Sequence, residues 1–172
     1  MSSRSRALAW LLVLVWFVWI LAFQGWLARG AGFGRLTPDL GSVFLVSLAG
    51  TLARRDVLLA ALVAALARKS LSIDPAAAIL FGMLALGGVA HALRSVVEIG
   101  GPFWRTLLSC AGAVGFSLWL QLVRAARHGS TGLELEPGAL AWSAVASALV
   151  ALALGGFLVR LPGLSPLRRT AW

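Results

Sequence analysis

The amino-acid sequence predicts an all-α membrane protein, a bundle of six transmembrane helices. Of its 172 residues, 60% are hydrophobic and only 12% are charged, and the mean hydropathy is +0.91. A soluble domain would carry about 25% charged residues. Apolar stretches approaching the roughly 20 residues needed to cross a hydrocarbon layer recur along the chain. We therefore expect a single integral membrane domain over residues 1–172, with lipid as its main solvent.

The positive charge of the chain is spread over expected helix ends. The formal net charge is +9, from 15 Lys and Arg against 6 Asp and Glu. The basic residues stand singly or in pairs between apolar stretches, as in Arg54-Arg55 and Arg68-Lys69. This pattern is typical of anchors that face anionic headgroups, each contributing about 1 kcal/mol. We expect no nucleic-acid partner, because no basic stripe with interleaved aromatic residues is present.

The apolar stretches predict six membrane helices, with five as the alternative count. The first stretch is longer than the hydrophobic region of a cleaved signal peptide, so we expect it to be retained as a membrane helix. Proline, glycine or charged residues separate the later stretches and interrupt or end helices. The expected helices cover residues 7–28, 38–53, 57–73, 75–97, 103–124 and 138–159.

Residues 38–73 allow two interpretations, because Arg54-Arg55-Asp56 divides them. A single long helix would place these charges near mid-membrane, which is costly. A helical hairpin would place them at the membrane surface, with Arg68 and Lys69 snorkelling outward near the end of its second helix. We favour the hairpin.

Two dipeptides of proline and aspartate predict where helices begin. In Thr37-Pro38-Asp39 the Thr37 hydroxyl can cap a helix, and Pro38 needs no N–H partner in the first turn. The Asp39 carboxylate favours the positive end of the helix dipole. Asp74-Pro75 repeats the pattern before a helix whose glycines allow close approach to a neighbour. These glycines are Gly82, Gly87 and Gly88.

Three ionisable residues, His91, Arg94 and Glu98, lie about one turn apart near the end of the fourth expected helix. Because ionisable groups inside membranes are functional candidates, a proton relay or ligand site is one interpretation. The other, which we favour, is a helix end at the headgroup layer with a surface ion pair. Other polar side chains are expected to form hydrogen bonds between helices, namely Gln24, Ser117 and Gln121.

Motifs that carry catalysis are missing from the sequence. It has no His-Glu-x-x-His, Gly-x-Ser-x-Gly, phosphate-binding Gly-Lys loop or paired acidic motif. A single cysteine, Cys110, excludes an internal disulfide and a zinc cluster. We therefore expect no catalytic residue, no cofactor, no metal site and no enzymatic activity. The candidates left for interaction or structural roles are Pro38, Asp39, Asp74, Pro75, His91 and Arg94.

The order of these features along roughly residues 35–160 resembles the MreD family, the small membrane component of the bacterial cell-elongation machinery. An N-terminal membrane helix precedes a loop and a Pro-Asp helix start, and two more hydrophobic helices and a basic tail complete the match. The residues that carry the resemblance are Pro38-Asp39, the apolar segment 40–46, Arg54-Arg55, Asp74 and Pro75, the three glycines and Arg94.

The resemblance implies a six-helix fold similar to the substrate-binding components of energy-coupling-factor transporters. It implies a non-enzymatic scaffold or adaptor that couples the cell-shape cytoskeleton to peptidoglycan synthesis during elongation of the lateral wall. The implied partners are an MreC-like periplasmic scaffold, wall-synthesis enzymes and MreB filaments. The implied location is the bacterial cytoplasmic (inner) membrane.

Both termini are expected in the cytoplasm. This orientation leaves nine basic residues on the cytoplasmic side (4, 6, 54, 55, 94, 105, 160, 168 and 169) and six outside. Two other functions remain open. One is a solute-binding subunit of a vitamin or metabolite transporter, and the other is a small subunit of a different envelope complex. The pocket of the former would use Trp104, His128 and Glu134 with Arg68 or Lys69.

Overall fold

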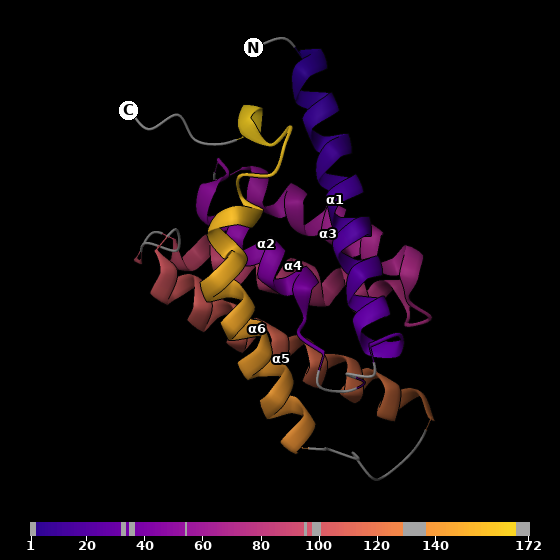
Figure 1. Ribbon diagram of the computed structural model, residues 1–172. Coiled ribbons are helices and arrows are strands. Elements are labelled where there is room, and N and C mark those ends of the chain that lie inside the picture. Colours follow the sequence, from indigo (N-terminus) through magenta and orange to yellow (C-terminus); the bar gives the residue numbers. More distant parts are fainter. Residues whose placement is uncertain are drawn as a thin grey trace.

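The computed structural model describes residues 3–31, 34, 37–53, 55–94, 96–97, 101–128 and 137–167. The regular elements of this part are all helical, and they pack into one bundle (Figure 1). They are α1 (Ser3–Arg29), α2 (Leu40–Thr51), α3 (Asp56–Leu71), α4 (Ala76–Leu93), α5 (Pro102–His128), α6 (Pro137–Leu158) and the short 3-10 helix η2 (Ser165–Leu167).

Four helices, α1, α4, α5 and α6, are long and apolar enough to cross a membrane. The chain is therefore an α-helical membrane protein, as the sequence predicts. The predicted and observed helix ends differ by at most four residues. The fourth predicted helix ends at Leu93 instead of residue 97, and a turn follows in which the N–H groups of Val96 and Val97 both donate to the Leu93 carbonyl.

The short helix α2 lies at the centre of the bundle and contacts each of the other five α-helices. Its residues 40–49 are all buried, so no face of it is left for lipid. At 1.5 Å per residue its 12 residues span about 18 Å, well short of a hydrocarbon layer of about 30 Å. The sequence predicted two membrane helices over 38–73. The division into two helices is confirmed, whereas α2 is a buried core helix.

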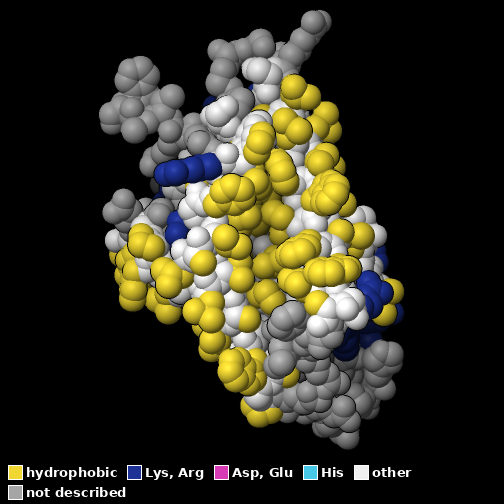
Figure 2. Space-filling model, viewed as in Figure 1, with side chains coloured by type: hydrophobic (Ala, Val, Ile, Leu, Met, Phe, Trp, Pro, Cys, Tyr) yellow, Lys and Arg dark blue, Asp and Glu magenta, His cyan; other side chains and the backbone are white. Residues whose placement is uncertain are grey.

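The outer surface of the bundle has the character of a surface solvated by lipid. Helix α3 turns a row of alanines inward, and its exposed large residues include Leu58, Leu62 and Leu66. A water-soluble helix would expose polar residues on that outer face. Small inward residues let helices approach closely, and outward leucines are typical of a surface that faces lipid. Figure 2 shows the same character on another face, where hydrophobic side chains dominate and Lys and Arg lie toward the edges.

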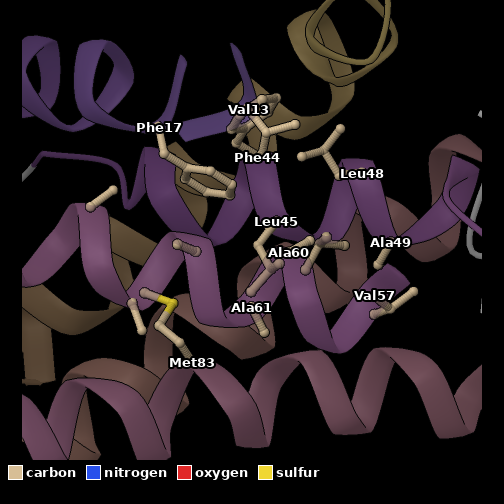
Figure 3. Packing of buried hydrophobic residues seen from close by; sticks show 14 of the residues in the cluster. Val13, Phe17, Phe44, Leu45, Leu48, Ala49, Val57, Ala60, Ala61 and Met83 are labelled. Atoms are coloured by element: carbon tan, nitrogen blue, oxygen red, sulfur yellow. The ribbon is translucent and has the colours of Figure 1, made fainter. Parts of the chain in front are cut away.

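The core is built where α1, α2, α3 and α4 meet (Figure 3). The rings of Phe17 and Phe44 lie 4.6 Å apart between α1 and α2. Ala60 and Ala61 of α3 and Met83 of α4 fill the other side of α2, all at most 1% exposed. The alanines matter because they let α3 lie close to three neighbours at once.

The start of α1 lies beside the segment 161–167, and we call this the terminal end of the molecule. The indole Nε1 of Trp16 donates to the Pro162 carbonyl at 3.2 Å, and α1 contacts η2. Gly163 lies against Leu12 and has a φ of +83°, a conformation that favours glycine. The chain therefore brings its first and last described elements together (Figure 1).

Candidate functional site

The opposite end, which we call the cavity end, is formed by the end of α1, the start of α2 and residues 72–75. Here Asp39 caps α2, although only 4% of its surface is exposed. Its carboxylate accepts from the backbone N–H of Ser42 at 3.2 Å and from the Ser42 hydroxyl at 2.9 Å. The sequence assigned the cap to Thr37, which is wrong. The Thr37 hydroxyl instead donates to the Gly34 carbonyl, and Pro38 lies in the turn before the cap.

Side chains of α1 and α6 accept hydrogen bonds from backbone N–H groups at the start of α2. The Asp39 N–H donates to Ser147 Oγ of α6 at 2.8 Å, and the Leu40 N–H donates to Gln24 Oε1 of α1 at 3.0 Å. The contact of Gln24 confirms the predicted hydrogen bond between helices. Gln121 differs, because its Oε1 is buried without a hydrogen-bond partner among the described residues.

The side chain of Arg68 turns inward, so the prediction that it snorkels outward is wrong. Its Nη1 donates to both Asp39 carboxylate oxygens, at 2.8 and 3.1 Å, and only 17% of the side chain is exposed. The guanidinium also lies 4.1 Å from the ring centroid of Phe116 on α5. The attraction between a buried carboxylate and a nearby cation is stronger than it would be in water, because the protein interior screens charge weakly. This attraction holds the Arg68 side chain inside. Lys69 is exposed, as predicted.

A second ion pair joins Asp74, in the link between α3 and α4, to Arg124 of α5. Arg124 Nε and Nη2 donate to the two carboxylate oxygens at 2.8 and 2.9 Å, and Ser72 Oγ donates to one of them at 2.9 Å. These contacts, led by the Arg124 hydrogen bonds, lower the pKa of Asp74 from its ordinary value of 3.8. Helix α4 begins at Ala76, one residue after the predicted start, and the cap position is held by Pro75, so the prediction that Asp74 caps it is wrong.

A cavity of about 340 Å³ lies between the two ion pairs, within the range typical of small-molecule sites. Leu21, Leu71 and Leu120 form an apolar part of its wall. Its polar wall includes Gln24, Asp39, Arg68, Ser72, Asp74 and Arg124.

The other two candidates from the sequence, His91 and Arg94, lie at the far end of α4, away from this cavity. Arg94 Nη1 donates to the Leu52 carbonyl, so it ties the end of α4 to the end of α2. The predicted partner of Arg94, Glu98, lies outside the described residues. Arg6 and Asp56 form a further ion pair near this end, between α1 and α3.

The pocket expected from the sequence is only partly right. Arg68 lines the cavity, but Trp104 is near the start of α5, about 30 Å along the helix from Arg124. The side chain of His128 and all of Glu134 lie outside the part described. Arg124 was missed, because it is fifty positions from Asp74 and no local spacing relates them.

Comparison with protein-family models, with curated proteins and with solved structures finds no match to this chain. No group of three or more His, Cys, Asp or Glu residues that could hold a metal ion occurs in the described ranges. The fold and the site thus define a class only: an α-helical membrane protein with a buried central helix and a polar cavity at one end.

Proposed function

We propose that this protein is a non-enzymatic membrane adaptor similar to MreD, which links the cell-shape cytoskeleton to wall synthesis in lateral elongation. The proposal includes a location in the bacterial inner membrane, both termini in the cytoplasm and a six-helix fold like that of energy-coupling-factor substrate-binding components. The adjacency of α1 and residues 161–167 supports termini on one side. The resemblance to the MreD family is supported by the order of Pro38-Asp39, before α2, and Asp74-Pro75, before α4.

The observation that carries the adaptor proposal is an apolar groove of about 290 Å³ between α4 and α5. Small residues line it, including Gly82, Gly112 and Gly115, together with the aromatic residues Phe81 and Trp119. Membrane helices associate through such small-residue surfaces, because they allow close backbone approach. A single membrane helix of an MreC-like scaffold or of a wall-synthesis enzyme would fit this groove. Contacts with MreB filaments would use the cytoplasmic end.

Affinity purification in mild detergent tests the adaptor proposal. Gly115 lines the groove and a Cβ there meets no atom within 4 Å, so Gly115→Leu places an apolar side chain in the groove from an open position. Gly156→Leu is the matched control, because that position on α6 is equally open and does not line the groove. We expect elongation proteins to co-purify with the natural chain and the control, and to be lost with Gly115→Leu. Recovery of an ATPase module instead would contradict the proposal.

A second candidate is a solute-binding membrane subunit, and the polar cavity favours it. The cavity has the volume of a small-molecule site and has charged groups beside an apolar wall. Thermal unfolding of the purified protein with a panel of vitamins and metabolites tests this candidate. A saturable rise of the unfolding temperature with one compound would support it, and no rise with any compound would argue against it.

A further inference from the structure

We propose that the polar cavity binds an oxyanion, a carboxylate or phosphate that carries an apolar group. This inference rests on the solute-binding candidate and names its ligand class. The groups that carry it are the two ion pairs, Asp39 with Arg68 and Asp74 with Arg124, together with Gln24.

The two carboxylates that line the cavity already accept hydrogen bonds from the protein. Asp39 accepts two bonds from Arg68 and two from Ser42. Asp74 accepts two bonds from Arg124 and one from Ser72. A bound cation would compete with these donors for the same carboxylate oxygens. The cavity is therefore poorly suited to a cationic ligand.

Hydrogen-bond donors, in contrast, remain available within the described residues. A guanidinium has five N–H groups in a planar fork. Arg68 bonds Asp39 through Nη1 alone, and Arg124 bonds Asp74 through Nε and Nη2, which leaves its Nη1. Gln24 uses its carbonyl oxygen for Leu40 and keeps its amide N–H groups. Spare donors from two arginines match the acceptor geometry of a carboxylate or phosphate.

The charge and shape of the site agree with this ligand class. The two ion pairs of the cavity wall balance in charge, and Lys69, which lies outside that wall, donates to the Asp74 carbonyl at 2.9 Å and adds one positive charge beside them. Arg124 is 55% exposed, which leaves it free to contact an entering group, whereas Arg68 lies deeper. The leucines of the wall would hold the apolar part of the ligand. A lipid headgroup and a free amphiphilic acid share this chemistry.

The test measures unfolding of the full chain by tryptophan fluorescence. In neutral detergent, octanoate and octyl phosphate are compared with octanol and octylamine. In nanodiscs, phosphatidylcholine alone is compared with phosphatidylcholine containing phosphatidylglycerol. We expect saturable stabilisation by the acids or by the anionic lipid, but not by octanol or octylamine. Stabilisation by the lipid alone identifies a headgroup as the source, and stabilisation by the free acids identifies a soluble ligand.

Variants assign the effect to the cavity. Asp74→Asn with Arg124→Gln removes one pair without leaving a buried charge, and we expect binding about tenfold weaker. Arg127→Gln is the control, since Arg127 is an exposed α5 arginine outside the cavity wall. Equal binding by both variants, equal effects of octanol and the acids, or no stabilisation of the folded protein would overturn the oxyanion proposal. A neutral solute that binds in a manner sensitive to the double variant would reject the oxyanion but leave the solute-binding candidate standing.

Discussion

The contact between α3 and α4 at Gly87 provides the sharpest test of the packing. A Cβ added at Gly87 would lie 2.7 Å from the Cβ of Ala61 and 3.7 Å from the Val57 carbonyl oxygen. Carbon atoms pack best at about 3.5–4.0 Å, so Gly87→Ala must separate the two helices by about 1 Å. Neither Ala61 nor the alanine introduced at position 87 has a flexible side-chain end that could move aside. Overpacking of this kind costs about 1–3 kcal/mol.

The neighbouring Gly88 supplies a matched control, because a Cβ there meets no atom within 4 Å. Either substitution in the same helix exchanges glycine for alanine, which favours the helix by about 1 kcal/mol. The difference between Gly87→Ala and Gly88→Ala therefore isolates the packing cost. We expect Gly87→Ala to be less stable by about 1–3 kcal/mol.

The assay is reversible unfolding in mixed micelles, in which a denaturing detergent is titrated and helix content is followed by circular dichroism. A difference between the two variants below about 0.5 kcal/mol, the usual range for surface changes, would refute the close contact of α3 and α4.

Three further predictions use the same assay. Asp39→Asn should destabilise the protein by about 3–5 kcal/mol, because Arg68 is left without its counter-ion. Adding Arg68→Met to this variant should restore part of the loss. Additive losses of stability would contradict the coupling of the two residues. The pKa of Asp74 is lowered in the folded state, so its stabilisation is present above its ordinary pKa of 3.8 and is lost as the pH falls through the folded value. Asp74→Asn should therefore flatten the acid limb of the stability profile, and an unchanged slope would contradict the pairing. Trp119→Phe removes an indole N–H bond of 2.8 Å to a carbonyl of α4 and should cost about 1 kcal/mol, more than Trp142→Phe at an exposed site; equal losses would argue against that bond.

The positions of the long helices could be predicted because lipid solvation demands long apolar stretches, and proline, glycine and charge interrupt them. The burial of α2 could not be predicted in the same way. A helix that is apolar on every side has the same sequence character in lipid as in a protein core. Its length was the available signal, since an apolar run of about 10–14 residues more often forms a core helix than a membrane span.

The cavity was less accessible from the sequence than the helices were. Asp39 and Asp74 stood out as helix-start residues, but their partners are twenty-nine and fifty positions away. Arg68 was assigned to the membrane surface because cations near helix ends usually snorkel there. That rule fails where a buried carboxylate lies within reach, and only the packing of α2 against α3 places one there.

The ion pairs have a further consequence for how the helices choose their neighbours. Lipid tails are as apolar as leucine, so contacts between apolar faces distinguish poorly between a neighbouring helix and lipid. The three acidic residues that the structure describes are each paired with an arginine, in α1–α3, α2–α3 and between the 72–75 link and α5. An exchange of neighbours would leave a largely buried carboxylate without its guanidinium partner, which is costly. We therefore expect the pairs to contribute more to the specificity of helix arrangement than to the total stability. The cavity between two of them is consequently preformed, because its walls are held by the same contacts that select the fold.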